Sequence, residues 1–79
     1  MRLSVSIVVP AFDSANYLRE SLPQLTAGSL NDLEIIVVDD GSTDETAVVA
    51  RAFPVALLTV QERRGPAFAR NLGAKAATG

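Results

Sequence analysis

The sequence predicts an α/β fold in which three strands form one parallel sheet, in the order β-α-β-α-β-α. Three short apolar runs rich in Val, Ile and Leu alternate with three segments whose apolar residues recur at helical spacing. Strands that alternate with helices form parallel sheets joined by right-handed crossovers. We therefore expect a Rossmann-like sheet, with the first strand beside the second and the second beside the third.

The first strand is predicted at residues 3–9, which alternate and then become continuously apolar, as in a strand buried on both faces. Pro10 is expected to end this strand, because proline has no N–H to give to the ladder. The expected strand order leaves one side of this apolar strand unpaired, and such an open edge favours self-association. We therefore expect that a fourth strand is missing and that residues 1–79 form part of one domain.

The first helix is predicted at residues 15–25, with Asp13 or Ser14 as its N-terminal cap. Pro23 lies inside this segment and is expected to kink or shorten the helix. A proline at such a position removes one helical hydrogen bond and clashes with the preceding turn.

The second helix is expected to begin after Ser42 and to end near residue 52. Its start fits a capping box, in which Ser42 caps the helix and Glu45 reaches back. The third strand is predicted at residues 55–60. The third helix is predicted to begin at Pro66 and to continue over residues 67–78, with the final glycine as its C-terminal cap.

Two adjacent carboxylates, Asp39 and Asp40, follow the second strand, which is predicted at residues 33–38. Gly41 then allows a tight turn. Ligands of open α/β sheets sit at the carboxyl ends of the strands, which is where this pair lies. A turn aspartate that complements a helix dipole explains one member of the pair, but a second adjacent carboxylate is explained less well because like charges repel. The residues alone leave structural and functional roles open.

The composition excludes several classes of function. The chain has no Cys and no His, which excludes disulfides, thiolate metal sites and the commonest general base. A net charge of −2 does not indicate the basic surface that nucleic-acid-binding proteins carry. No apolar run reaches the length of a membrane span, and we expect a cytoplasmic location, with membrane association left to a longer parent protein.

Three motifs occur in order after the three predicted strands. They are Val8-Val9-Pro10-Ala11-Phe12-Asp13, Val37-Val38-Asp39-Asp40-Gly41-Ser42-Thr43-Asp44 and Arg64-Gly65-Pro66-Ala67-Phe68-Ala69-Arg70-Asn71-Leu72-Gly73. Together they resemble the start of a family 2 glycosyltransferase, over essentially the whole chain. The resemblance implies the N-terminal half of a GT-A domain and inverting transfer of a sugar from a nucleotide-sugar donor to an unknown acceptor.

The resemblance also implies which residues bind the donor. Pro10, Ala11 and Phe12 would line the base pocket, with Phe12 in place of the family's usual tyrosine. Asp40 would accept a hydrogen bond from the ring N–H of a uracil or thymine, and Asp39 would make a neighbouring contact or brace the turn.

The third motif would serve the diphosphate. Gly65 would allow close approach of a phosphate to the backbone, and Arg70 would balance the diphosphate or pair with Asp40. Asp13 and Ser14 depart from the family's asparagine and glutamate, which puts a contact by Ser14 in doubt. Phe53 and Phe68 are interpreted as core residues.

Parts of the family's machinery are missing from the sequence. The Asp-x-Asp motif that binds Mg²⁺ or Mn²⁺ does not occur, and the family's general base and acceptor site lie beyond this stretch. We therefore expect a truncated, inactive donor half of a transferase. The alternatives are a non-catalytic nucleotide-binding module and a structural α/β fragment. A receiver domain fits poorly, because its acid pair follows the first strand and its phospho-acceptor aspartate the third. A nucleotidyltransferase fits poorly, because its glycine-rich loop after the first strand is missing here.

Overall fold

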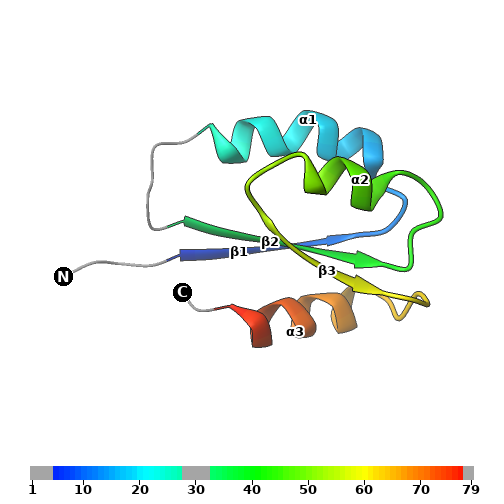
Figure 1. The fold of residues 1–79 in the computed structure, drawn as a ribbon. Coiled ribbons are helices and arrows are strands. Elements are labelled where there is room, and N and C mark those ends of the chain that lie inside the picture. Colours follow the sequence, from blue (N-terminus) through cyan, green and yellow to red (C-terminus); the bar gives the residue numbers. More distant parts are fainter. Residues whose placement is uncertain (1–4, 28–32, 78–79) are drawn as a thin grey trace.

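The protein forms one three-stranded parallel sheet with helices on both faces. A computed structural model describes residues 5–27 and 33–77. The strand order is β1-β2-β3, as the sequence predicts, so that β2 is central and β1 lies at an edge of the described sheet. Helices α1 and α2 cover one face and α3 covers the other (Figure 1).

All six predicted elements are present in the predicted order. Their bounds are β1 Val5–Ala11, α1 Ala15–Thr26, β2 Leu33–Asp40, α2 Thr46–Arg51, β3 Ala56–Val60 and α3 Pro66–Ala76. The parts of the predictions that fall on residues 3, 4, 78 and 79 lie outside the described residues. Helix α3 already ends at Ala76, with Ala77 extended at the C-cap position, so the prediction that the final glycine caps it is wrong.

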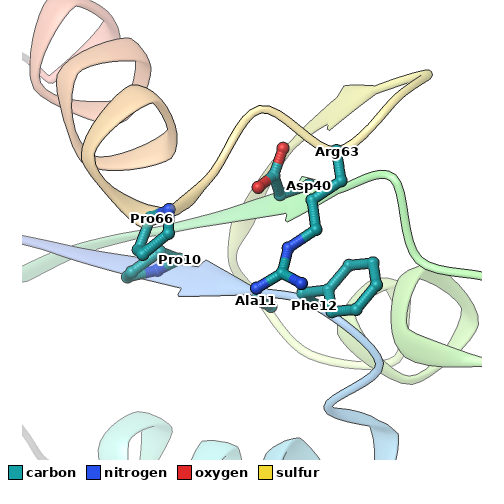
Figure 2. Close-up of a pocket in the computed structure, with 6 residues that line it drawn as sticks. All are labelled: Pro10, Ala11, Phe12, Asp40, Arg63 and Pro66. Carbon is teal, nitrogen blue, oxygen red and sulfur yellow. The ribbon is translucent and has the colours of Figure 1, made fainter.

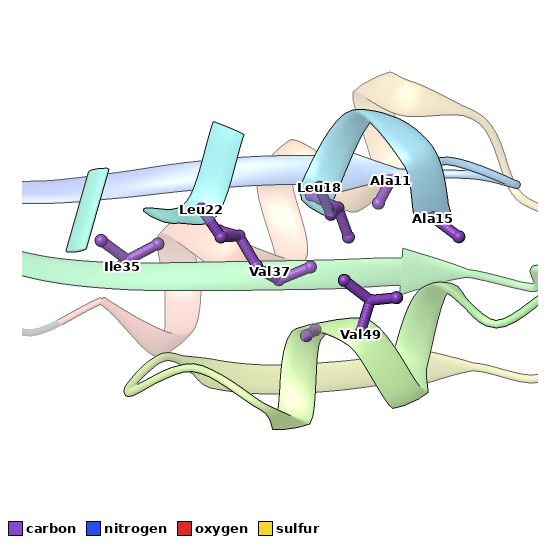
Figure 3. Close-up of a cluster of buried hydrophobic side chains, with 8 residues drawn as sticks. Ala11, Ala15, Leu18, Leu22, Ile35, Val37 and Val49 are labelled. Carbon is purple, nitrogen blue, oxygen red and sulfur yellow. The ribbon is translucent and has the colours of Figure 1, made fainter. Parts of the chain in front are cut away.

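Strand β2 builds both halves of the core, because its successive side chains point to opposite faces. Ile35 and Val37 pack with α1 and α2 (Figure 3), while Ile36 and Val38 pack with α3. Each of these side chains is at most 6% exposed. Full burial of such a side chain stabilises a fold by roughly 1.5–3 kcal/mol, so β2 is the main source of apolar burial in the sheet.

Two strands run two residues further than predicted. Strand β1 continues through Pro10 and Ala11, which lie opposite Val38 and Asp39 in the register. Proline is tolerated there because β1 has a neighbouring strand on one side only within the described sheet, so its missing N–H need not remove a ladder bond. Strand β2 likewise includes both aspartates, which pair with β3. The pair therefore belongs to the strand end and not to the turn.

The N-cap position of α1 is predicted correctly and that of α2 is not, and neither helix has a side-chain cap. Ser14 occupies the N-cap position of α1, but its side chain bonds the backbone of Phe12 and does not cap the helix. The N–H of Ala15 donates instead to Asp44 of the β2–α2 loop, at 3.3 Å. Glu45, not Ser42, occupies the N-cap position of α2, again without a side-chain cap. Contacts between the two loops replace the local contacts that sequence spacing suggests.

Helix α1 is not shortened by Pro23, because it extends three residues beyond the proline to Thr26. The carbonyl of Pro23 still accepts the N–H of Ala27 at 3.0 Å. Buried Leu22 and partly buried Leu25 hold this last turn against the core. Tertiary packing therefore overrides the local cost of the proline.

Of the two phenylalanines interpreted as core, one is confirmed and one is wrong. Phe53 is partly buried against the core cluster of α1 and α2. Phe68 is 43% exposed, because the face of α3 that meets the sheet carries Ala69 and Gly73 instead. The Arg64 guanidinium lies over the Phe68 ring, 5.8 Å from its centroid.

Gly73 lets α3 lie close against β1. A Cβ at this position would stand 2.4 Å from Val8 Cγ1 and 3.2 Å from Val38 Cγ2. Both distances are shorter than an ordinary carbon–carbon contact. The glycine therefore sets the spacing between this helix and the sheet.

We expect Gly73→Ala to lower the free energy of unfolding, measured by urea denaturation. Alanine gains about 1 kcal/mol of helix propensity, but overpacking of a core typically costs about 1–3 kcal/mol. In a Val8→Ala background the shortest contact is removed and the 3.2 Å approach to Val38 remains, so the same substitution should there cost less. A Gly73→Ala protein that is more stable than the parent would contradict the close approach.

Candidate functional site

The loops that follow the three strands meet at the carboxyl edge of the sheet. A hollow with about 250 Å³ of empty space opens there to solvent (Figure 2). It is lined by Pro10, Ala11, Phe12, Asp40, Arg63 and Pro66. The residues come from the end of β1 and the residue after it, from the end of β2, and from the β3–α3 connection with the first residue of α3. Three separate segments of sequence thus form one concave surface.

Asp40 ties the end of β2 to the loop before α3. Its side chain is almost fully buried, and its two carboxylate oxygens accept the backbone N–H groups of Arg64 and Gly65, each at 2.8 Å. A buried carboxylate needs such donors to offset the loss of water. Each oxygen keeps a second lone pair, so Asp40 can still accept a hydrogen bond from a ligand in the hollow.

Asp39 lies on the opposite face of the sheet and does not line the hollow. It is 7% exposed and accepts the N–H of Ser42 at 3.1 Å, at the start of the β2–α2 loop. Because the two aspartates end a strand, their carboxylates point apart, which limits the repulsion between adjacent like charges. Asp39 therefore braces the turn, one of the two roles expected for it.

Phe12 forms one wall of the hollow and is 36% exposed. The guanidinium of Arg63 lies over its ring, 4.0 Å from the centroid, in a cation–π arrangement. Figure 2 shows this guanidinium inside the hollow.

The loop that carries Phe12 is fastened to the β2–α2 loop. Asp13, at a φ of 47°, donates its N–H to Ser42 Oγ at 2.9 Å and accepts the N–H of Thr43 at 2.8 Å. The N–H of Ser14 donates to the fully buried Thr46 hydroxyl at 2.8 Å. These bonds hold the turn after β1 in an otherwise uncommon left-handed conformation, and they fix where Phe12 stands.

Asp44 completes this fastening. The hydroxyl of Thr46 donates to its carboxylate, and this bond, helped by the N–H groups of Thr46 and Ala15, holds the pKa of Asp44 below its ordinary 3.8. A lowered pKa in the folded state means that the stabilisation is present above pH 3.8 and is lost as the pH falls through the folded pKa.

Gly41 lets the β3–α3 loop lie against the end of β2. Its φ is +73°, and a Cβ on it would stand 2.6 Å from the backbone nitrogen of Arg63. Gly65 has a φ of +97° with open space around it. The two glycines thus place the loop whose N–H groups reach Asp40.

The structure brings together most of the site residues expected from the sequence. Pro10, Ala11, Phe12 and Asp40 line one hollow, and Gly65 reaches it through its N–H on Asp40. Arg70 is exposed on α3 and makes no ion pair with Asp40, whose oxygens accept backbone N–H groups instead.

Sequence reasoning missed Arg63 and Pro66 as lining residues. The signal for Arg63 was its place in the basic pair that directly precedes Gly65. Spacing alone does not say which of the two arginines turns toward the site.

The described residues give no metal centre and no membrane span. Residues 5–27 and 33–77 hold no group of three acidic side chains that could bind a metal ion. Asp39 and Asp40 do not supply two ligands to one metal site, because their side chains lie on opposite sides of β2. None of the described helices is long and apolar enough to cross a membrane.

Residues 6–79 match the sequence model described as Glycosyl transferase family 2. The chain belongs to this family. It is 39% identical over 72 residues to an uncharacterised glycosyltransferase of Rickettsia prowazekii, a match that covers 90% of the chain and 23% of that relative. It is 35% identical over 80 aligned positions to glycosyltransferase GlyG of Streptococcus pneumoniae, covering 95% of the chain and 27% of GlyG.

Solved structures of glycosyltransferases share the fold. S. aureus TarS, residues 1–349, superposes with a TM-score of 0.88 at 28% identity, over 98% of this chain and 25% of the TarS chain. Mannosyltransferase PcManGT of Pyrobaculum calidifontis, solved with GDP-Man and Mn²⁺, superposes with a TM-score of 0.84 at 33% identity. This match covers 99% of this chain and 25% of the PcManGT chain. These likenesses confirm the family and the Rossmann-like fold. The family 2 chain spans about a quarter of the length of these relatives.

We expect Gly41→Ala to destabilise the fold in urea denaturation. The left-handed backbone costs alanine about 1–2 kcal/mol, and crowding against the Arg63 backbone adds about 1–3 kcal/mol. Gly41→Asn is the matched variant, because asparagine tolerates positive φ but carries the same Cβ. Recovery of the parent's stability by asparagine would show that backbone conformation alone, and not the close approach, requires glycine.

Proposed function

We propose that this chain is the donor-binding part of a longer glycosyltransferase that moves a sugar from a nucleoside diphosphate sugar to an acceptor. The observation that carries the proposal is the meeting of Phe12, Asp40 and the segment 10–11 in one hollow at the carboxyl edge of a parallel sheet. Ligands of open α/β folds bind at this edge. Membership of glycosyl transferase family 2 supports the reaction class, and inversion at the sugar follows from the family resemblance.

The base of the nucleotide would occupy the hollow. Phe12 offers an exposed ring on which a base can stack, and Asp40 offers acceptor lone pairs to a ring N–H. Uracil and thymine carry one such N–H. PcManGT was solved with GDP-Man, and guanine also carries a ring N–H. Uridine and guanosine diphosphates are therefore the two probes to compare.

The diphosphate would lie toward the start of α3. The positive end of a helix dipole favours anions, and α3 begins at Pro66 beside the hollow. Gly65 would let a phosphate approach the backbone, and exposed Arg70 would balance part of its charge. Asp39, behind the turn, would act by bracing the β2–α2 loop.

This part of the chain would bind the donor and leave the chemistry to other residues. Asp40 is the carboxylate that lines the hollow, and both its oxygens accept backbone N–H groups, so it is held as an acceptor. PcManGT was solved with Mn²⁺. We propose that a divalent metal, if Mg²⁺ or Mn²⁺ serves here, is held with the general base by residues beyond this chain. The cytoplasmic location and self-association through the β1 edge stay predictions of the sequence.

We expect Asp40→Asn in the full-length protein to weaken binding of uridine or guanosine diphosphate, measured by calorimetry. An amide presents a donor where the base needs an acceptor, and loss of a charge-assisted hydrogen bond costs roughly 1.5–3 kcal/mol. Asp39→Asn is the control and should weaken binding less, because Asp39 lies on the other face of the sheet.

The substitution at Asp40 also removes an acceptor from one backbone N–H, so a melting curve must show that the variant is folded at the temperature used. An unchanged affinity in a folded Asp40→Asn protein would rule out base recognition by this carboxylate.

We expect Phe12→Ala to reduce nucleotide affinity by roughly 1–3 kcal/mol, the scale of base–aromatic stacking. Phe68→Ala is the control, since Phe68 is also exposed, at 43% against 36% for Phe12, lies beneath an arginine and does not line the hollow. If Phe12 served only to pack the core, the variant would lose thermal stability without nucleotide and keep its affinity when folded.

A further inference from the structure

Arg63 places a cationic side chain in the hollow. Its guanidinium contacts the ring of Phe12, and among the described residues it makes no hydrogen bond or ion pair. A guanidinium carries five N–H donors in a planar fork that matches a phosphate. Arg63 therefore presents a group that can bind an anion, in the hollow and over the ring of Phe12.

The backbone of Arg63 is fixed while its side chain can move. Its nitrogen lies against Gly41, within 2.6 Å of where a Cβ would stand, and the next N–H in the chain bonds Asp40 at 2.8 Å. The residue as a whole is exposed to solvent. A change of the Arg63 rotamer is thus the motion that this loop allows without breaking its bonds to Asp40.

The guanidinium and a nucleotide base would compete for the same surface. At 4.0 Å from the centroid, the guanidinium is at stacking distance on the Phe12 ring. Arg63 lines the hollow, and Figure 2 shows its guanidinium beside Phe12. A base that stacks on this face must first displace the arginine, and it loses the cation–π contact in doing so.

We propose that Arg63 is a gate that makes the site selective for nucleoside diphosphates over nucleosides. The guanidinium covers Phe12 in the empty site and turns onto the diphosphate when a nucleotide binds. The inference rests on the proposed function. A nucleoside must displace the arginine without compensation, whereas a nucleoside diphosphate provides acceptors for the guanidinium. A ligand shifts a conformational equilibrium only through such a difference in affinity for the two states.

The test compares uridine with UDP, and guanosine with GDP, on the full-length protein and its Arg63→Ala variant. We expect Arg63→Ala to bind the nucleoside about two- to fivefold more tightly, the factor that corresponds to an exposed cation–π contact. It should bind the diphosphate about tenfold or more weakly, because a charge-assisted contact is lost. The preference for the diphosphate should therefore shrink.

Arg64→Ala is the matched control. It removes the same charge from the adjacent position, keeps the backbone N–H that bonds Asp40, and changes a side chain that lies over Phe68 outside the hollow. We expect it to keep the parent's preference for the diphosphate. Arg63→Lys keeps the charge without the planar fork and should retain part of the diphosphate affinity.

Three results would overturn the gate. Weaker nucleoside binding in Arg63→Ala would mean that the guanidinium supports the base and does not block it. No change with either ligand would leave Arg63 outside the site, and equal effects of Arg64→Ala would reduce the result to net charge. In all three, the parent still binds the diphosphate and the proposed function stands. A parent that binds neither UDP nor GDP would refute the proposed function itself.

Discussion

The carboxyl edge of this sheet depends on one buried interaction, the acceptance of two backbone N–H groups by the carboxylate of Asp40. These two hydrogen bonds join the central strand to the loop that precedes α3, so they set where that helix begins and where Arg63 lies. Removal of a buried acceptor leaves its donors unsatisfied, which costs more than the bond itself contributes. The same carboxylate lines the hollow, so its structural role is linked to the recognition role that we propose for it: the bonds that hold the loop also orient the acceptor toward the hollow.

A second set of bonds acts between loops that are far apart in sequence. Asp13, Ser42 and Thr46 connect the turn after β1 with the turn after β2, and they replace the local caps of both helices. The aromatic wall at Phe12 is positioned by this contact and not by its own helix. The two loops of the site are consequently one mechanical unit, while the third loop is attached to the sheet separately through Asp40 and Gly41.

The order of elements, the strand pairing and most helix bounds could be predicted from the sequence, because buried β-branched runs and the position of Pro66 are local signals. The strand ends at Ala11 and Asp40 could not, since local rules assign Pro10 and adjacent carboxylates to turns. The side-chain caps failed for a related reason: the partners of Asp13 and Asp44 lie about 30 residues away. Motifs assigned Phe12 and Asp40, which line the hollow, to the proposed site, whereas Arg63 was missed because its place in the hollow depends on the path of a loop.

The alternation of β2 carries a constraint on how this family 2 chain can vary. Asp39 lies on the face of the sheet that α1 and α2 cover, and Asp40 lies on the face that α3 covers. Neighbouring positions of β2 therefore make their contacts in different halves of the molecule. Because the side-chain period of a strand is two, an insertion or deletion of one residue within β2 would exchange the two faces for every residue beyond it. The carboxylate that braces the turn would then point toward the hollow, and the one that lines the hollow would point toward α1 and α2. Within β2, only insertions or deletions of an even number of residues keep each side chain on its face of the sheet. The connections between the elements are not subject to this constraint.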